Sequence, residues 1–492
     1  MKTIPVPGFC GPTNTAISTV IDSQRTINLY PEVEQKDAKT PNALVGRPGL
    51  GPTLITLGSS PVRQLWSGDN RLFAVSGTHA YEIGSAGVVI TDFGAMAAST
   101  GVGPAKMIAN GTQLLVFDRS AGAPSGQIFS MDAGPPGVAG TTARRAAIAM
   151  EYLDGFYVAL DVGNLMYVSN FLDGTVWPAL NVVQLTGGAD AKGQLAVLNS
   201  QLWVFGQKTT EVWYNAGNPL FPFARVPGAT LNLGCLAFDT VVTFQDSIIW
   251  LGTDTNGIAH VYQTQGIGAK IVSNPAIENA IGGITTANPS GNAGNMAYSH
   301  AYSYTENGHT FYVLQLSNSS FTPQSSYVYD LITGMWHERT YAAAWPVCYT
   351  NVGGVAFNVT GPGLIGDGFS GKVMYQGQGY TSDAGTSIVY TRIFPHIADR
   401  NHFIKYPSLE LDCDIGTAQP VLSYSNDGGK TYPYTLAALA GSGETSNGSF
   451  PRFIWRQLGR SRDRVFKLVI TNAANLIRLV NAYIGVSPGT EA

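Results

Sequence analysis

The densest group of reactive side chains in the sequence is a basic cluster near its end. The segment FPRFIWRQLGRSRDRVFK carries Arg452, Arg456, Arg460, Arg462, Arg464 and Lys467. Guanidinium groups bind phosphate or carboxylate groups through paired hydrogen bonds. Two strands joined by the turn GRSRD would place several of these groups on one edge. The cluster therefore predicts a protein interface, a nucleic-acid contact or the solvated rim of a hairpin.

A second motif precedes this cluster. Ser425, Asp427, Gly429, Thr431 and Tyr432 in SYSNDGGKTY match the Asp-box pattern Ser-x-Asp-x-Gly-x-Thr-aromatic. In sialidase-like propellers the motif recurs on several blades, where its Asp and Thr side chains satisfy backbone groups of a turn. Here it occurs once, so we interpret it as a structural hairpin and not as a glycosidase relic.

Spacing elsewhere indicates no catalytic set. The seven histidines show neither HxH nor HExxH spacing, and GxGxxG and GxxxxGK[ST] motifs do not occur where nucleotide binding would need them. Glycoside hydrolysis needs two placed acids, or a Tyr nucleophile with carboxylate-binding arginines. Most acids of the middle region lie in turns, such as Asp69, Asp154 and Asp246. We therefore expect no enzyme activity, no cofactor and no metal site.

The middle of the chain repeats a short apolar run that follows a turn of Asp, Asn, Gly or Ser. The runs LFAV, LLVF, FYVA, LWVF, IIWL, FYVL and AFNV begin at Leu72, Leu114, Phe156, Leu202, Ile248, Phe311 and Ala356, with intervals of 42, 42, 46, 46, 63 and 45 residues. A unit of this length with three or four strands is typical of a β-propeller blade. We predict a propeller of six or seven blades over residues 61–384. A run of β-sandwiches is the alternative, but it does not explain the regular interval.

The longest interval contains the segment Ile284–Asn295, which is rich in Gly and Asn. We expect it to be a loop inserted between blades. It could instead hide a degenerate blade, so the blade count stays open by one.

Two regions flank the repeat. Residues 1–60 have little periodicity and predict an extended N-terminal arm that packs outside the blades, against a neighbouring subunit or an adaptor. Residues 385–492 contain strand patterns without the blade interval and predict an antiparallel β-sandwich. Alternation in SLELDCDI places Leu409, Leu411 and Cys413 on its inner face.

Composition agrees with an all-β protein. The chain has 58 Gly and 27 Pro, both unfavourable inside helices, and only 12% charged residues. We find no secretory signal pattern and no apolar stretch long enough to span a bilayer. The four cysteines are widely spaced, so we expect reduced, buried thiols.

Both ends of the chain resemble one protein family. INLYPEVE at Ile27–Glu34 and LVGRPGL at Leu44–Leu50 resemble the opening of tail proteins from short-tailed bacteriophages. SLELDCDIG, SYSNDGGKTY and WRQLGRSRDRVFKLVI are similar to the closing domain of the packaged-DNA-stabilisation protein, the tail hub or nozzle of podoviruses. The resemblance covers about 60 residues at the start and about 90 at the end.

The resemblance implies a structural virion protein. Such proteins form a homohexameric ring below the portal and the head-to-tail adaptor proteins, retain the genome, conduct double-stranded DNA during ejection and dock tail fibres or spikes and the tail tip or needle. Assembly would take place in the host bacterial cytoplasm. The rival hypothesis is a carbohydrate-binding or glycoside-hydrolysing propeller that stacks sugars on Trp213, Tyr214, Trp336 and Trp345.

Charge distribution decides how we interpret the basic cluster. Residues 61–384 carry 12 basic and 20 acidic side chains, whereas residues 385–492 carry 11 and 8. An acidic middle region repels DNA, but it can attract the basic cluster of an adjacent copy. We therefore assign the cluster to subunit or partner contacts and not to DNA.

Overall fold

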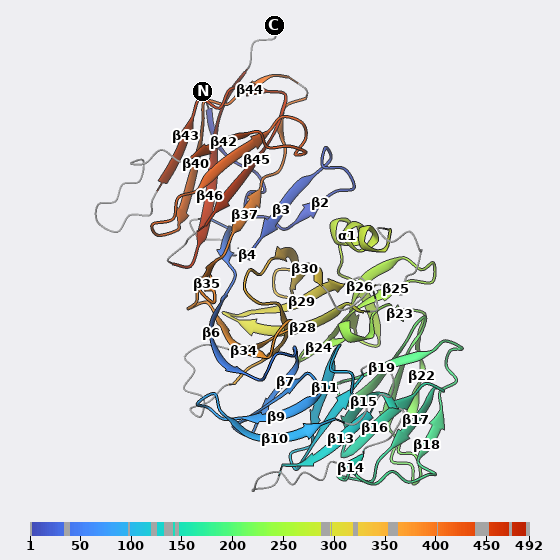
Figure 1. The fold of residues 1–492 in the computed structure, drawn as a ribbon. Helices are drawn as coiled ribbons and strands as arrows, with labels where there is room; N and C mark the ends of the chain where they lie inside the picture. The colour runs from blue at the N-terminus through green and yellow to red at the C-terminus, as the bar shows by residue number, and fades with distance from the viewer. Residues whose placement is uncertain are drawn as a thin grey trace.

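The computed structural model describes residues 2–33, 40–96, 99–119, 125–131, 141–142, 147–286, 296, 298–317, 323–352, 363–400, 402–437, 452–471 and 475–488. These residues form many short strands and one α-helix, α1 (Pro275–Thr286), with a 3-10 turn, η1 (Phe238–Thr240). Figure 1 shows a ring of sheets below a second group of strands that holds the end of the chain. The prediction of a mostly β protein is confirmed.

Consecutive antiparallel sheets, each with four main strands, build the lower body. Their first strands are β7 (Val62–Gly68), β11 (Ala105–Ala109), β15 (Ala147–Leu153), β19 (Lys192–Leu198), β23 (Gly234–Cys235), β28 (His300–Glu306) and β32 (Pro346–Thr350). Their second strands are β8 (Arg71–Ser76), β12 (Gln113–Asp118), β16 (Phe156–Asp161), β20 (Gln201–Gly206), β25 (Ile248–Thr253), β29 (His309–Ser317) and β33 (Gly363–Asp367). In the fifth sheet, β24 (Val242–Thr243) also pairs with β25.

The outer strands complete the same sheets. The third strands are β9 (His79–Ile83), β13 (Ser125–Ser130), β17 (Leu165–Val168), β21 (Thr210–Asn215), β26 (Ala259–Gln265), β30 (Pro323–Asp330) and β34 (Lys372–Gly377). The fourth strands are β10 (Val89–Ala95), β14 (Thr141–Thr142), β18 (Val182–Gln184), β22 (Phe223–Leu231), β27 (Gly268–Ile271), β31 (Met335–Arg339) and β6 (Gly49–Thr56).

Contacts between neighbouring sheets close the ring. The first strands of successive sheets contact one another, with η1 and β24 taking part at the fifth sheet, and β32 of the last sheet contacts β7 of the first. Seven sheets follow one another in the described residues, within the predicted range of six or seven blades. Apolar side chains on facing sheets pack together between them, as Leu195 and Leu202 do with Val158.

The repeated apolar runs are the second strands, where both faces of a sheet are covered. Six of the seven runs begin β8, β12, β16, β20, β25 and β29 or lie one to two residues inside them. Phe73, Val116, Val158, Val204, Trp250 and Val313 within them are all buried, as predicted. The seventh run, from Ala356, lies outside the described residues.

The arm differs from its prediction. Its strand β6 pairs antiparallel with β34 and supplies the outer strand of the last blade sheet, so this part of the arm does not pack outside the blades. The pairing joins residues more than 300 positions apart, and no local pattern indicates it. The division into residues 1–60, 61–384 and 385–492 stays a proposal.

The long interval between the fifth and sixth runs contains α1, whose last residues, 284–286, overlap the start of the expected loop at Ile284–Asn295. Asn274 caps this helix, because its side-chain oxygen accepts a hydrogen bond from the backbone of Ile277 at 3.0 Å. Pro275 occupies the first helical position, where its missing N–H group costs nothing. Residues 287–295 of the expected insertion lie outside the described part.

The C-terminal strands form two facing sheets together with the arm. One contains β1 (Lys2–Pro5), β4 (Leu29–Val33), β5 (Asn42–Gly46), β39 (Ile404–Lys405), β40 (Ser408–Asp414), β43 (Arg452–Arg456), β44 (Arg460–Ser461) and β46 (Arg478–Pro488). The other contains β2 (Asn14–Thr15), β3 (Ser23–Ile27), β37 (Tyr390–Ile393), β38 (Ile397–Ala398), β41 (Val421–Ser425), β42 (Tyr434–Ala437) and β45 (Asp463–Ile470). β35 (Ser382–Asp383) and β36 (Thr386–Ser387) lie at the junction, next to β6.

A single core fills the space between these two sheets. Leu409, Leu411 and Cys413 are buried in it, as the alternation predicted, beside Phe466 of the opposite sheet. Phe9 of the arm lies in the same core, 4.9 Å from Phe394 between ring centroids. The arm is therefore part of this core.

Candidate functional site

The six basic side chains of the C-terminal cluster do not form one surface. Arg464 is only 1% exposed, and its guanidinium lies over the rings of Tyr406 and Tyr424, with 4.5 and 4.2 Å to their centroids. It donates hydrogen bonds to Asn426 and to the backbone carbonyls of Leu458 and Arg460. The expectation that Arg464 contacts a partner is wrong, because the residue holds the domain together from inside.

Two more of the six have partners within the chain. Arg452 pairs with Glu410 of the neighbouring strand β40 at 2.5 Å. The ammonium group of Lys467 lies 5.5 Å from the centroid of the Tyr432 ring. The carboxylate of Asp463, the one acid within the segment FPRFIWRQLGRSRDRVFK, binds His396 at 2.9 Å.

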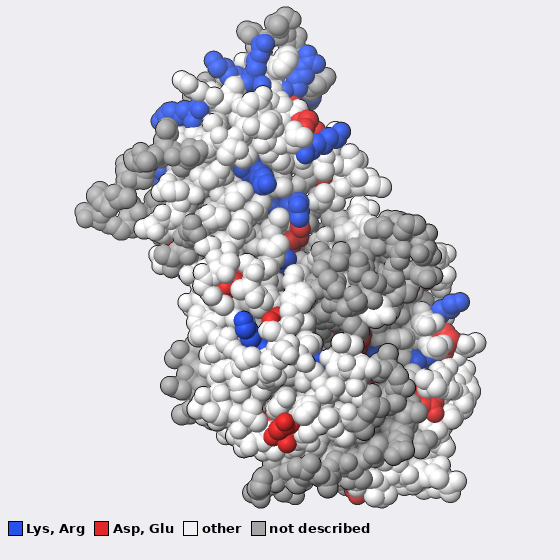
Figure 2. Space-filling model, in the orientation of Figure 1, with Lys and Arg blue, Asp and Glu red and all other residues white. Residues whose placement is uncertain are grey.

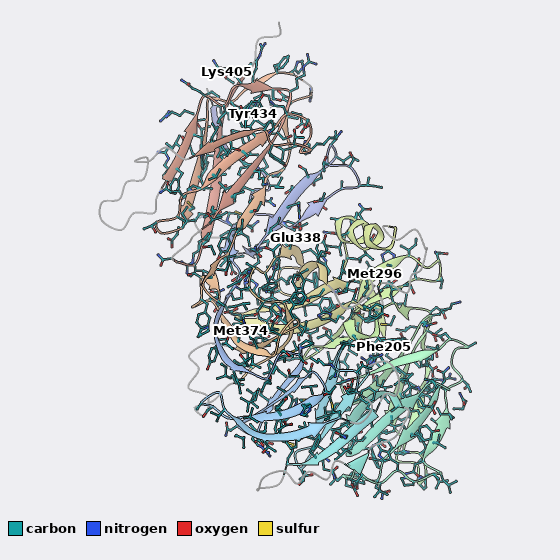
Figure 3. The ribbon with its side chains drawn as sticks, viewed as in Figure 1. Phe205, Met296, Glu338, Met374, Lys405 and Tyr434 are labelled. Atoms are coloured by element: carbon teal, nitrogen blue, oxygen red, sulfur yellow. The ribbon has the colours of Figure 1, made fainter. Side chains whose placement is uncertain are left out.

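The three remaining members of the cluster, Arg456, Arg460 and Arg462, are exposed. Together with the exposed Lys405 of β39 they make up what we call the basic tip. Lys405 and Arg460 face each other across the β39–β44 pair, and Arg460 and Arg462 both lie over the Phe403 ring. Figure 2 shows Lys and Arg gathered on the upper end of the molecule, while the propeller surface in this view carries few charges. Figure 3 places Lys405 at that end.

The Asp-box-like hairpin has the hydrogen bonds of a turn. The Asp427 carboxylate accepts from the Thr431 hydroxyl at 2.6 Å and from the Thr431 backbone at 3.0 Å, and Ser425 Oγ accepts from the Gly429 backbone at 2.9 Å. Hydrogen bonds from Ser425 and Thr431 hold the pKa of Asp427 well below its usual range. Gly428 has φ of +73°, and an added Cβ would lie 2.8 Å from Val20 Cγ2. The hairpin therefore packs against the turn between β2 and β3.

Strand β3 joins the propeller to the C-terminal domain. It pairs parallel with β31, the outer strand of the sixth sheet, and antiparallel with β37 of the C-terminal domain. Arg25 of β3 also binds Glu338 of β31 at 2.5 Å. Figure 3 shows Glu338 where the two bodies meet. One continuous sheet therefore crosses this junction.

Buried arginines support the same junction. Arg47 and Asp383 are each 1% exposed and pair at 2.6 Å, and Arg47 also donates to Asn28 Oδ1 and to the Thr340 carbonyl. Arg392 is fully buried and donates to Thr26 Oγ1 at 2.7 Å and to other acceptors of the arm. Burial lowers the pKa of Arg392 to about 10.

His309 links the arm to the sixth sheet. Its Nδ1 contacts Asp330 Oδ2 at 2.7 Å, and its Nε2 contacts Glu32 Oε2 of β4 at 2.9 Å. Burial disfavours the charged ring, but the hydrogen bonds and charges of the two carboxylates outweigh burial and raise the pKa of His309 to about 9. The imidazolium is therefore the form that joins the two carboxylates at neutral pH.

This raised pKa predicts a loss of stability in alkali. An unfolded histidine has a pKa of about 6.5, so the stabilisation is fully present below that pH and is lost as pH rises toward about 9. We expect a decrease in the free energy of unfolding on the order of 2 kcal/mol over this range. Urea unfolding at several pH values measures it. The His309→Gln variant should lack this slope, and an unchanged slope in the variant would assign the effect to other groups.

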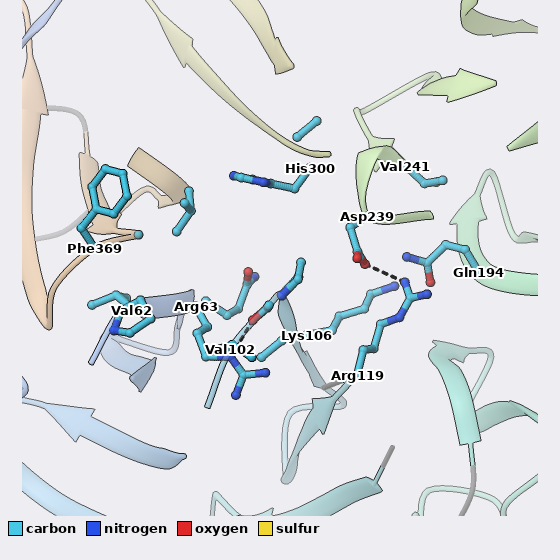
Figure 4. Close-up of a pocket in the computed structure, with 18 residues that line it drawn as sticks. Val62, Arg63, Val102, Lys106, Arg119, Gln194, Asp239, Val241, His300 and Phe369 are labelled. Atoms are coloured by element: carbon cyan, nitrogen blue, oxygen red, sulfur yellow. Dashed lines mark hydrogen bonds and ion pairs between the residues drawn. The ribbon is translucent and has the colours of Figure 1, made fainter. Parts of the chain in front are cut away.

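A cavity of about 360 Å³ lies at the centre of the ring, lined by residues of β7, β11, β19, β28 and β32. Figure 4 shows Lys106, Arg119, Asp239 and His300 around it. Ion pairs join different sheets at this level. Arg63 pairs with Asp118 at 2.5 Å and Lys106 with Glu151 between neighbouring sheets, whereas Arg119 pairs with Asp239 at 2.6 Å between the second and the fifth. The cavity wall is therefore mixed, because apolar side chains such as Val62, Val241 and Val347 line it together with these charged groups.

The aromatic residues of the carbohydrate hypothesis are mostly unavailable for stacking. Trp213 and Trp336 are 6% and 1% exposed and belong to the cores between blades, and the indole of Trp345 donates to Gln315. Tyr214 is 40% exposed. Within the described ranges we find no group of three metal-ligating side chains, and no helix there is long and apolar enough to cross a membrane. The four cysteines are free thiols.

Sequence reasoning missed the junction and the cavity. Arg47, Asp383, Arg392 and His309 are isolated in the sequence, and only strand pairing brings them to their partners. The cavity residues recur at blade spacing in first strands, as Arg63 and Lys106 do. That recurrence of charge in otherwise apolar inner strands was the available signal.

Comparisons with known proteins agree with this architecture. The family model "Phage_stabilise: Bacteriophage P22 Gp10, beta-propeller" matches residues 26–357. A search of curated proteins gave no match. Among solved structures, the designed Ika8 protein is 10% identical with a TM-score of 0.39, covering 66% of this chain and 99% of its own. The WD40 domain of Neurospora crassa Pan2 is 14% identical with a TM-score of 0.40, covering 66% of this chain and 94% of its own.

With TM-scores this low, the two solved structures carry no argument about this chain. The family match is different, because it spans well over half of the residues and names the fold that the strand pairing builds. The chain therefore belongs to the family of the bacteriophage P22 Gp10 β-propeller and is a structural stabilisation protein of the phage tail.

Proposed function

We propose that six copies of this chain form a ring-shaped nozzle below the portal and the head-to-tail adaptor proteins. The ring retains the packaged genome, conducts DNA during ejection and docks fibres or spikes and the tail tip. The family match over residues 26–357 carries this proposal. Assembly of the ring takes place in the host bacterial cytoplasm.

A rigid subunit supports a ring of this kind. The sheet that runs from β28 through β31, β3 and β37 to β45 joins propeller and C-terminal domain by backbone hydrogen bonds. Buried ion pairs such as Arg47 with Asp383 brace the same junction. A subunit that keeps one shape presents its contact surfaces at fixed angles, which a closed ring requires.

Mass measurement of the assembled tail particle tests the proposal. Six copies would contribute six times the 52.1 kDa subunit mass. A different copy number would overturn the hexamer. If the chain is monomeric and assembled tail particles do not contain it, the nozzle role itself is overturned.

We place the subunit contacts at the basic tip. The tip is exposed and cationic, and the propeller region carries the acidic excess, so a neighbouring copy offers a complement. Individual exposed ion pairs contribute only about 0.2–1 kcal/mol, and a group of them is needed to select a partner. DNA is the less favoured partner, because tight phosphate contacts would slow ejection.

Changing Arg460 and Arg462 together to Ser should reduce assembly without unfolding the chain. Both guanidinium groups are exposed and lie over Phe403, so their loss opens no cavity in the core. Particle yield measures assembly, and circular dichroism measures folding. Arg478→Ser, which changes an exposed arginine paired with Asp414, is the matched control. Normal assembly with lost genome retention would move the basic tip to the DNA channel and contradict the interface.

A further inference from the structure

The turn between β2 and β3 carries three large apolar side chains that face solvent. Ile17, Val20 and Ile21 are 84%, 53% and 69% exposed, and they lie within five residues of one another. Single exposed apolar side chains are common on protein surfaces, whereas a contiguous group of them marks a contact site. We call these three residues the apolar tip.

The polar groups of the same turn are bound within it. The Ile21 N–H donates to the Ser18 carbonyl at 2.9 Å. The Asp22 carboxylate accepts hydrogen bonds from the side chains of Asn14 and Gln24 at 2.9 and 3.1 Å. A turn adapted to water would show the reverse arrangement, with its polar side chains outward. This arrangement indicates that another molecule covers the apolar tip.

Contacts at both ends of the hairpin hold the apolar tip in place. At its base, the Thr13 N–H donates to a backbone carbonyl of β31 at 2.8 Å. At its turn, His396 Nε2 lies 2.8 Å from the Thr19 carbonyl, and Val20 packs against Gly428. A surface that is already fixed loses little conformational entropy when a partner binds it.

The apolar tip adjoins the basic tip. The His396 ring, which contacts the Thr19 carbonyl, also binds the Asp463 carboxylate at 2.9 Å. Asp463 directly follows Arg462 of the basic tip in the sequence. An apolar centre beside a charged rim is the usual anatomy of a protein–protein interface. The surface that we assign to subunit contacts therefore extends to the apolar tip.

Charge and position favour a second copy of this chain as the partner. The side chains of the apolar tip carry no charge, and the propeller surface in Figure 2 carries few charges, so contact between them desolvates few charged groups. Figure 1 shows the β2–β3 hairpin projecting sideways where the two bodies meet, above α1. In a ring whose axis runs along the long direction of the subunit, a sideways projection reaches the next copy.

We propose that the apolar tip packs against the neighbouring copy of this chain and forms the buried centre of the subunit contact, with the basic tip at its rim. This inference rests on the proposed ring. Contacts in a cyclic hexamer join two different surfaces, so the apolar tip meets another part of the next copy. Buried apolar centres supply most of the affinity of an interface, whereas exposed ion pairs contribute little each.

Changing Ile17 and Ile21 together to Ser tests the proposal. Purified chain is added to tail particles that lack it, and the mass of the particles reports its incorporation. We expect the concentration for half-maximal incorporation to rise at least about tenfold. This rise should exceed the one caused by changing Arg460 and Arg462 to Ser. Thermal unfolding of each variant shows that it is folded.

Two exposed isoleucines of the propeller provide the matched control. Ile258 and Ile332 are 53% and 65% exposed. Changing both to Ser removes similar apolar surface elsewhere and should alter the concentration for half-maximal incorporation by less than about twofold. An equal effect in the two double variants would overturn the assignment to the apolar tip. If the wild-type chain forms no ring on the particles, the proposed function fails as well. If it forms rings and the Ile17, Ile21 variant incorporates equally well, this inference alone fails.

Photo-cross-linking identifies the partner directly. The photoreactive amino acid p-benzoylphenylalanine replaces Ile17, and the particles are assembled from a mixture of unlabelled and ¹⁵N-labelled chains. After irradiation, mass spectrometry should find a cross-link that joins a labelled to an unlabelled copy of this chain. A cross-link to another virion protein, a cross-link within one copy only, or no cross-link in complete rings would overturn the proposal.

Discussion

Replacing Asp383 with Asn should lower the free energy of unfolding by about 3–5 kcal/mol, because it leaves a buried guanidinium without its counter-charge. Arg47 and Asp383 are each 1% exposed and pair at 2.6 Å. Arg47 lies between β5 and β6, and it also binds the Thr340 carbonyl that follows the sixth sheet. The loss should therefore affect the attachment of the arm to both bodies. Urea unfolding followed by tryptophan fluorescence measures it.

An exposed pair provides the matched control. Asp414→Asn makes the same chemical change in the pair with Arg478, whose side chains are 29% and 53% exposed. Solvent screens such pairs, so the expected loss is about 0.2–1 kcal/mol. If the two variants lose the same stability, burial is not what makes the Arg47 pair important. If Asp383→Asn alone loses cooperativity, the arm and the last blade sheet separate before the remainder unfolds.

The propeller could be predicted because its signal is local and repeated. Each second strand follows a tight turn, and both of its faces are covered, so runs such as LWVF at Leu202 and IIWL at Ile248 are continuously apolar. Positive φ angles in the turns explain the residues that precede the runs, such as Asn199 at +50° and Asn307 at +50°. The interval between the apolar runs and the residue types in the preceding turns together predict this part of the fold.

The arm and the junction could not be predicted in the same way. β6 pairs with β34, and β3 with β31 and β37, across hundreds of residues, and nothing in the composition of GLGPTLIT or SQRTI specifies those partners. In contrast, the start of α1 was readable, because Asn274 followed by Pro275 is a typical helix start. The prediction of a loop came from the glycine and asparagine residues of Ile284–Asn295, at and beyond the end of this helix.

The basic cluster shows how a charge pattern misleads when strand alternation is ignored. In β45, DRVFKLVI, residues two apart share a face, so Arg464 lies on the same face as Phe466, Leu468 and Ile470. All four are buried. Alternation therefore predicts an inward Arg464, and counting charges along the segment predicts an outward one. The structure follows alternation, since Tyr406, Tyr424 and nearby carbonyls compensate the guanidinium.

Arg464→Ala should consequently destabilise the chain by about 3 kcal/mol, in contrast to the exposed arginines beside it. The change removes the stacking on Tyr406 and Tyr424, and it leaves the carbonyls of Leu458 and Arg460 without their donor. Arg464→Lys should recover little, because an ammonium cannot replace a planar guanidinium that stacks and donates in several directions. Urea unfolding of both variants measures the loss.

Arg462→Ala is the control for this effect, and it should change stability by less than about 0.5 kcal/mol. Arg462 is exposed, and only Asp463 lies between it and Arg464 in the sequence. If Arg464→Ala were as stable as Arg462→Ala and instead lost assembly, the guanidinium would belong to an interface and the packing argument would be wrong. If it loses stability and assembly together, folding accounts for both, because β45 pairs with β37 and β41 in the sheet that connects the C-terminal domain to the propeller. Any test of the basic tip must therefore leave Arg464 intact.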